Sequence, residues 1–464
     1  MGFSQASIAI LSCVCLVCVA GCQTHRQLVQ QAHQQYWNGD LDAAVDNLSQ
    51  ARERPRRDEE VLMLDQAMVH FSRGELAQSS ELLKTVRDRF EEGTGFDGAH
   101  KAASYLTDDN ARLYEAEDHE RIMIGVLLAL FDLVQDGRDA TAYAYQLGET
   151  TEDLLSHRSP PEPERKKPDG TPSETEVLSK ELPPLDIVRE ELAIAPLLRG
   201  IVRGSFRMNQ DDRLRYLQQA VEWRPGSRFI MREFLAASGR RELPPGFGSV
   251  YVIALVGRGP IKQEAIEPVS SQALLVADQI LSAMGKYSIP PTLAPVKIAV
   301  VTAQDSGIAN LSVLANGQPA GTTETVADIN RLAVSRQQEL MSEIVARAVV
   351  RRIVKKSIVV GQKSRDHVDN DLVSLGYNAV GVLWEATERA DLRSWSLLPG
   401  QIQILRIELP AGSHRLGFSA NTTAGSTGRQ PFACNIEVRD GQSAFVLSSL
   451  SELTSPGRAI SNVN

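Results

Sequence analysis

Apolar positions in the second half of the chain recur mainly with a period of two, the spacing of β-strands. Residues 249–256 are largely apolar and precede Gly257-Arg258-Gly259-Pro260, which predicts a buried strand leading into a turn. Asn316-Gly317 predicts a tight hairpin turn. Further strands are predicted over residues 296–302, 308–314, 401–409, 414–420, 432–438 and 443–450. The last of these strands predict an antiparallel β meander or a small sandwich.

A period of 3.6 residues predicts helices in the first half of the chain and in one stretch of the second. Residues 122–134 form a strongly apolar helical pattern, and residues 326–360 form a long one. The pattern also predicts a helical hairpin from Ile194 to Pro225, with Leu217 and Ala220 on its second helix.

A pattern of small and apolar residues near the N-terminus occurs twice, at an offset of 35 residues. Gly39 and Gly74 open turns between helices, and the small Ala44 and Ser79 allow close helix approach. The pattern resembles the tetratricopeptide repeat, whose helix pairs stack on one another. A weaker third copy includes Leu130, Gly137 and Ala142. Such repeats either form a groove for a peptide or protein, or only pack against the neighbouring domain.

The first residues of the chain resemble a bacterial lipoprotein signal. Residues 7–20 are an uncharged apolar run with the length of a signal-peptide core. Val19-Ala20-Gly21-Cys22 follows and resembles a lipobox, which implies that Cys22 carries the lipid. Residues 1–7 lack the usual Lys or Arg, which leaves the true translation start open. A buried apolar N-terminal helix is the alternative to a signal peptide. Gln23 after the cysteine resembles an outer-membrane sorting signal, which implies the leaflet facing the periplasm.

Composition and charge narrow the class of protein. The 464 residues are 42% hydrophobic and 23% charged, as in globular proteins. The net charge of −9 opposes nucleic-acid binding, which requires a basic surface. Four cysteines fall in the signal region and only Cys434 lies in the mature chain, so an intramolecular disulfide is excluded. We expect Cys434 to be a buried apolar residue.

These patterns predict an α+β multidomain protein. Its N-terminal α-helical hairpins are tetratricopeptide-like, and an α/β module follows that ends in the meander or small sandwich. The predicted segments are a signal peptide (1–21), a helical domain (22–157), a Pro- and charge-rich linker (158–179), a further helical hairpin (180–240) and the C-terminal domain (246–464).

Three stretches resemble a group of bacterial tetratricopeptide lipoproteins without an assigned activity: residues 259–262, 346–355 and 390–399. The third is the most distinctive and contains Asp391, Arg393 and Trp395. These residues are candidates for a recognition spot, since Trp and Arg are frequent interface anchors. The alternative is a structural corner in which Arg393 pairs with Asp391 or backbone carbonyls while Trp395 packs on the sheet.

A search for chemistry finds no catalytic, cofactor-binding or metal-binding motif in the mature chain. His119 and His367 lie beside acidic residues in polar segments, which predicts solvated surface positions. The long helix ends in a basic cluster, which predicts either a patch for anionic lipid or polymer, or charge complementing the helix C-terminus. The cluster comprises Arg347, Arg351, Arg352, Lys355 and Lys356.

The sequence favours a membrane-anchored interaction or scaffold protein of the bacterial cell envelope. Its expected partners are the membrane, through the N-terminal lipid, and an envelope protein or peptide; neither nucleic acid nor a cofactor is expected. A hydrolase or binding protein that acts on cell-wall polymer through the C-terminal domain is the alternative. A purely structural envelope component is the third hypothesis.

Overall fold

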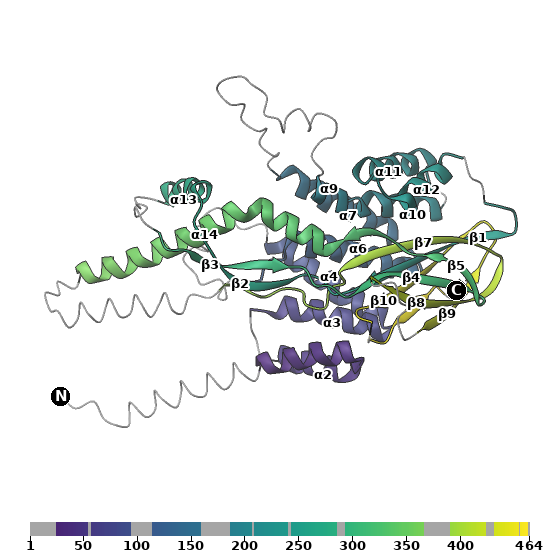
Figure 1. Cartoon of the computed structure of the whole chain (residues 1–464), viewed down its shortest axis with the longest axis horizontal. Coiled ribbons are helices and arrows are strands. Elements are labelled where there is room, and N and C mark those ends of the chain that lie inside the picture. The colour runs from purple at the N-terminus through teal and green to yellow at the C-terminus, as the bar shows by residue number, and fades with distance from the viewer. Residues whose placement is uncertain are drawn as a thin grey trace, which may run out of the picture.

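The computed structural model describes residues 25–53, 57–93, 114–158, 186–206, 208–239, 243–284, 293–365, 390–423, 431–453 and 455–462, with side chains of α14 described through residue 354. Helices dominate the first half, and strands with two further helices make up the second (Figure 1). The predicted α+β class is therefore confirmed.

Two equivalent helical hairpins open the described chain. The first joins a helix over residues 25–38 to α2 (Leu41–Arg52), and the second joins α3 (Glu59–Arg73) to α4 (Leu76–Gly93). Gly39 and Gly74 turn these hairpins with φ of 84° and 85°, a left-handed conformation that glycine adopts without steric penalty. The repeat in the sequence therefore corresponds to a repeat of the hairpin.

The small residues of the repeat lie where the helices approach most closely. Ala44 and Ser79 are fully buried, and the Ser79 hydroxyl donates to the Ala67 carbonyl at 2.7 Å. The third copy differs, because Ala142 is exposed while Ala144 is buried. There α6 (Asp118–Val134) and α7 (Ala140–Ser156) are joined by a longer turn, which moves the buried face along the helix.

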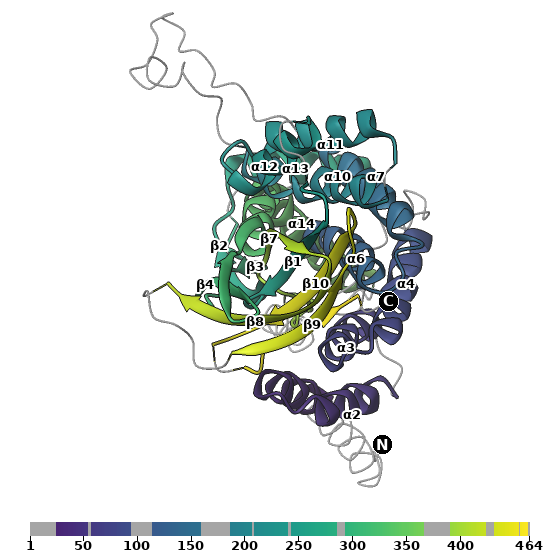
Figure 2. The same ribbon diagram turned by 90° about the vertical axis from the view of Figure 1, so that its right-hand side faces the viewer.

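The second group of helices continues the array. It consists of α9 (Ile187–Glu191), α10 (Ile194–Ser205), α11 (Gln210–Trp223) and α12 (Arg228–Ala237). Leu217 and Ala220 are fully buried on α11, which confirms the hairpin predicted between Ile194 and Pro225. Figure 2 shows the helices as an arc around the strands, from α12 and α11 through α7 and α4 to α3 and α2.

A five-stranded sheet forms the centre of the molecule, in the order β11-β10-β1-β7-β6. Strand β1 is buried along nearly its whole length and pairs in parallel with β10 and antiparallel with β7. The bounds are β1 (Phe247–Val256), β6 (Glu324–Asp328), β7 (Gln401–Pro410), β10 (Ser443–Leu450) and β11 (Arg458–Ser461).

A second, fully antiparallel sheet packs against one face of the first. Its order is β5-β4-β8-β9, with β4 (Ile308–Ala315), β5 (Gln318–Thr322), β8 (Gly412–Thr422) and β9 (Phe432–Val438). Val252 and Leu405 of the first sheet and Phe418 of the second share one apolar cluster. The pairing of these strands corrects one alternative, the terminal meander. After β7 the chain bends at Ala411 into the second sheet, and β10 returns to pair with β1.

The opposite face of the five-stranded sheet packs on the helices. Tyr251, Ile253 and Phe445 of this sheet belong to the same apolar cluster as the buried residues of α3, α6 and α10. The helical hairpins and the central sheet therefore share one core.

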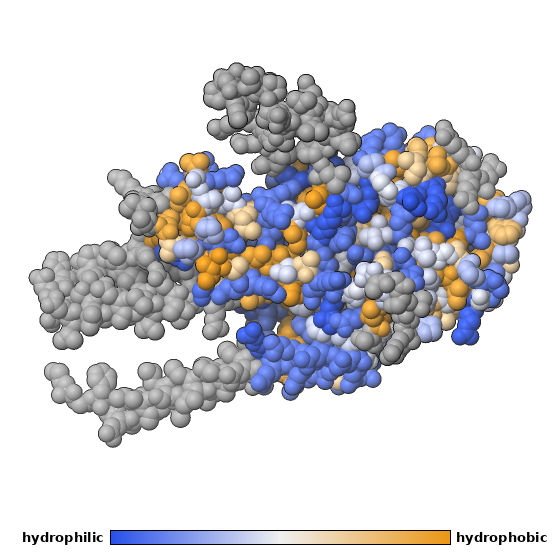
Figure 3. All heavy atoms as spheres, in the orientation of Figure 1, coloured by the Kyte–Doolittle hydropathy of each residue, from blue (hydrophilic) through white to orange (hydrophobic). Residues whose placement is uncertain are grey.

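A lobe at one end has a core of its own. It contains β2 (Ile261–Glu267), β3 (Val296–Thr302), α13 (Ser271–Met284) and α14 (Ile329–Arg365). The predicted start of the long helix at residue 326 is wrong, because residues 324–328 form β6 on the edge of the central sheet. Hydrophobic side chains gather on the surface of this lobe (Figure 3). Among the described helices, none combines the length and apolarity needed to span a bilayer.

The described residues on either side of the Pro- and charge-rich linker lie close together. Arg158, at its start, pairs at 2.9 Å with Asp186, where the described chain resumes after it. We expect replacement of residues 160–184 by about six Gly and Ser residues to change the unfolding free energy by at most about 1 kcal/mol, because closing a shorter loop costs less entropy. Urea unfolding followed by circular dichroism measures this. A loss of several kcal/mol would show that the segment supports the core.

Candidate functional site

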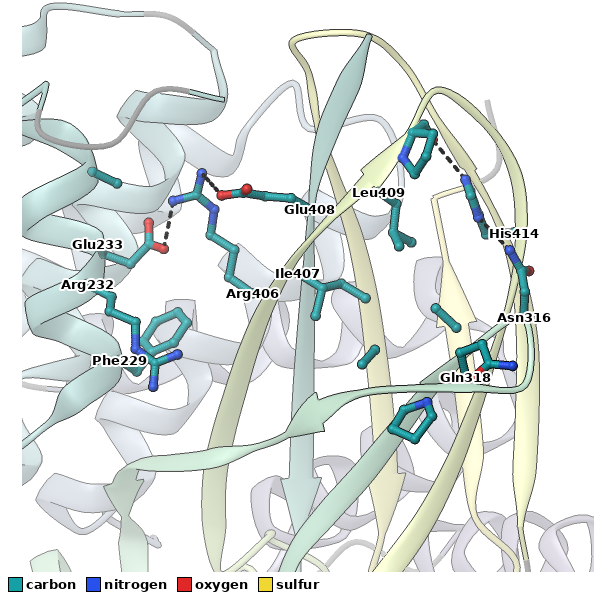
Figure 4. Close-up of a pocket in the computed structure, with 15 residues that line it drawn as sticks. Phe229, Arg232, Glu233, Asn316, Gln318, Arg406, Ile407, Glu408, Leu409 and His414 are labelled. Carbon is teal, nitrogen blue, oxygen red and sulfur yellow. Dashed lines mark hydrogen bonds and ion pairs between the residues drawn. The ribbon is translucent and has the colours of Figure 1, made fainter. Parts of the chain in front are cut away.

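A groove of about 610 Å³ lies between α12, the end of β7 and the β4–β5 hairpin (Figure 4). Glu324, the first residue of β6, places α12 there: its carboxylate accepts the Ser227 hydroxyl at 2.6 Å and the Phe229 N–H at 3.0 Å. Helix α12 is thereby anchored beside the point where β6 begins. The groove is lined by Phe229, Arg232, Glu233, Ala236, Ala315, Asn316, Gln318, Pro319, Ala320, Arg406, Ile407, Glu408, Leu409, Pro410 and His414.

Arg406 is the centre of a charged network on the α12 side of the groove. Its guanidinium contacts Glu233 at 3.2 Å and Glu408 at 3.8 Å and donates to the Ser249 hydroxyl at 2.9 Å. Burial disfavours the charged form of Arg406 and by itself lowers the pKa of Arg406. The nearby Tyr251 and Glu233 have the larger combined effect, so the pKa of Arg406 is raised. Burial and the neighbouring Glu233 raise the pKa of Tyr251, so its hydroxyl stays protonated and donates to Glu233 at 2.8 Å.

The opposite wall presents the polar side chains of His414 and Asn316. His414 Nε2 lies 2.8 Å from the Pro410 carbonyl, so this nitrogen carries the proton. Its Nδ1 then accepts from the Asn316 side-chain amide at 2.9 Å. Glu233 and Glu408 are both tied to Arg406, which disfavours them as an acid and base pair for hydrolysis. The arrangement is suited to hydrogen bonding and charge recognition.

Sequence reasoning missed this groove because its walls come from three distant segments, residues 229–236, 315–320 and 406–414. One signal was available: Arg406 and Glu408 interrupt an apolar strand at alternate positions. This alternation indicates that both side chains share one face, but it does not indicate that α12 covers that face.

Asp391, Arg393 and Trp395 lie together in the segment between residues 390 and 400. Asp391 accepts from the Arg393 backbone N–H at 3.0 Å and from its guanidinium at 2.6 Å, and Arg393 also donates to the Arg57 carbonyl. Trp395 is 1% exposed. These are the contacts expected of a structural corner, and a role in partner recognition stays a prediction.

Two buried carboxylates of the helical half bind the backbone of this corner. Glu120 accepts the Trp395 N–H at 2.8 Å, and Asp65 accepts the Leu397 N–H at 3.0 Å. Glu120 also accepts the Tyr114 hydroxyl. Burial and the nearby Glu120 raise the pKa of Tyr114, so the tyrosine remains a donor.

His119 is buried, which corrects the solvated position predicted for it. It lies near Glu117 and Lys262, which pair at 2.5 Å. Burial lowers the pKa of His119 although the neighbouring Glu120 and Glu117 oppose this. Burial also disfavours both charges of the Glu117–Lys262 pair, but their mutual attraction lowers the pKa of Glu117 and raises that of Lys262.

Several predicted residues lie outside the described ones, namely Val19, Ala20, Gly21, Cys22 and His367. Cys434 is partly buried against the apolar cluster that the two sheets share, and burial raises its pKa to about 11, which opposes thiolate formation. Two residues of the basic cluster contact other residues of the lobe: Arg347 pairs with Glu343 on the same helix, and Arg352 donates to the Pro295 carbonyl at 3.0 Å. The described residues contain no metal-binding group of three or more His, Cys, Asp or Glu side chains.

Comparison with known proteins identifies no relative: the chain matches no family model, and no curated protein or solved structure is significantly similar to it.

The corner generates a prediction for stability. Trp395→Ala should lower the unfolding free energy by about 3–5 kcal/mol through a cavity. Glu120→Ala should lower it by about 2–3 kcal/mol because buried donors lose their acceptor. Urea unfolding followed by circular dichroism measures both, with the exposed Glu149→Ala as a matched control. A loss below about 1 kcal/mol for Trp395→Ala would contradict the corner and favour a surface role.

The buried histidine generates a prediction for pH. Because the pKa of folded His119 lies below its ordinary value of 6.5, the unfolded chain takes up a proton first as the pH falls. Folding stability is therefore lost as the pH falls below about 6.5. We expect His119→Gln to lose less stability than the native protein between about pH 7.5 and about pH 5.5.

Urea unfolding at the two pH values tests this expectation. His157→Gln is the matched control, since the side chain of His157 is 72% exposed. Equal losses in the native protein and His119→Gln would contradict it.

Proposed function

We propose that this protein is a lipid-anchored interaction protein of the bacterial cell envelope. Lipid on Cys22 holds it to the outer membrane on the periplasmic side. An envelope protein or peptide binds in the groove between α12, β7 and the β4–β5 hairpin. The observation that carries this proposal is the groove itself, which is lined by both polar and apolar side chains and lies at a sheet edge.

The position of the first hairpin supports close tethering. The described chain is helical from His25, which is three positions after Cys22. An extended tether of that length spans at most about 11 Å. A lipid on Cys22 therefore keeps the first hairpin beside the membrane surface.

The shared core supports a scaffold rather than a free repeat array. The hairpins bury their apolar faces against the central sheet, so the face used in packing is not available to a partner. The groove in the C-terminal half is then the better site for binding. Both of its carboxylates are in contact with Arg406, which favours binding over hydrolysis of cell-wall polymer.

Substitution of the lipidated cysteine tests the anchor. We expect the native protein to sediment with membranes and to incorporate a labelled fatty acid, and Cys22→Ser to lose both properties because no thiol receives the lipid. Cys434→Ala is the matched control and should keep both. Labelled, membrane-bound Cys22→Ser would contradict the proposed anchor.

A further inference from the structure

We propose that the groove binds its partner as an extended strand that pairs with the outer edge of β7 and places an acidic side chain against Arg232. This inference rests on the proposed function and names the kind of partner segment. It is carried by the backbone orientation of β7 and by the charge that α12 presents.

The register of β7 determines which of its backbone groups face the groove. The Ala411 N–H donates to the Gly246 carbonyl at 2.8 Å, and hydrogen-bonded pairs alternate along antiparallel strands. Counting from this end of the β1–β7 ladder, the backbone N–H and C=O groups of Leu405, Ile407 and Leu409 face β1. Those of Arg406 point away from β1.

Strand β6 does not extend to Arg406. The pairing of β6 with β7 begins at Asp328 opposite Gln401 and ends at Glu324 opposite Ile404. Before Glu324 the chain lies in β5, which pairs with β4 in the other sheet. The backbone N–H and C=O of Arg406 therefore face the groove beyond the end of β6. Edge groups of this kind are the ones that β-strand addition uses.

A strand bound there would project alternate side chains toward the two walls. One wall, from the β4–β5 hairpin, contains Ala315, Pro319 and Ala320, which fit small apolar side chains. The other wall is α12. Arg232 lines this wall, is exposed, and forms no ion pair with any described residue. An acidic side chain at the facing position is therefore complementary in charge.

A defined peptide tests the proposal with the full-length lipoprotein in detergent micelles. The probe is fluorescein-labelled Ala-Thr-Val-Asp-Val-Thr-Ala-Thr, compared with the same peptide carrying Lys in place of Asp. Fluorescence anisotropy should show binding of the Asp peptide about tenfold tighter than of the Lys peptide, because Arg232 attracts one charge and repels the other. Arg232→Glu should reverse this preference. Arg228→Glu, an exposed residue of the same helix outside the groove, should leave it unchanged.

N-methylated peptides test the backbone pairing independently of charge. Methylation at every second residue in one register removes the N–H groups that face β7, and methylation in the other register leaves them intact. We expect one set to lose binding at least tenfold and the other to keep it. Equal binding of both sets, equal binding of the Asp and Lys peptides, or no binding of either would overturn strand docking.

Different outcomes contradict the lipid anchor and the strand-docking proposal. If Cys22→Ser stays membrane-bound and acylated, the proposed function loses its anchor whatever the peptides do. If a partner purifies with the native lipoprotein and with Arg232→Glu in equal amounts, the protein remains an interaction protein but strand docking at this groove is overturned.

Discussion

Two carboxylates without solvent exposure join the helical half of this protein to its strands. Asp65 and Glu120 are fully buried, and a buried carboxylate is stable only when hydrogen bonds replace its water. Those bonds come from the backbone N–H groups of Leu397 and Trp395. His33 completes the shell of Asp65 at 2.7 Å. Each carboxylate therefore depends on a hydrogen bond from the corner, and the backbone of the corner depends on acceptors from both α3 and α6.

The corner in turn positions the strand that carries the groove. Residue 401, the first of β7, follows it directly. The carbonyl of Leu398 accepts the Gly259 N–H at 2.6 Å, and a Cβ on Gly400 would lie 2.4 Å from the Arg258 carbonyl. These close contacts set where β7 begins beside β1. The contacts at the start of β7 thus fix the position of the strand, including the backbone edge at Arg406.

The local sequence pattern predicted where most strands lie, but it did not predict which strands pair with one another. Strands over residues 432–438 and 443–450 agree with β9 and β10 to the residue, because turn residues bound both runs. Their separation into two sheets was not predictable, since alternation shows which face is buried but not which strand lies alongside. Residues 326–328 looked helical because a short apolar run fits either period.

The candidate sites show the same limit. His119 looked solvated because its sequence neighbours are acidic, whereas tertiary packing buries it. Lys262, whose charge acts on its pKa, is also distant in sequence. The pairing of Arg393 with Asp391 is local and was foreseen as one of two interpretations. The groove has walls from three segments, so no local window contains it.

The two ends of the described chain touch, and this affects how the molecule reaches its native state. Ser455 donates to the Trp37 carbonyl at 2.8 Å, and Pro456 packs directly over Gly39. Strand β10, the parallel neighbour of β1, also lies far from it in the sequence. The central sheet therefore cannot close until β10 has been synthesised. Such long-range closure slows folding, so the edges of β1 and the early strands stay unpaired until β10 docks beside them.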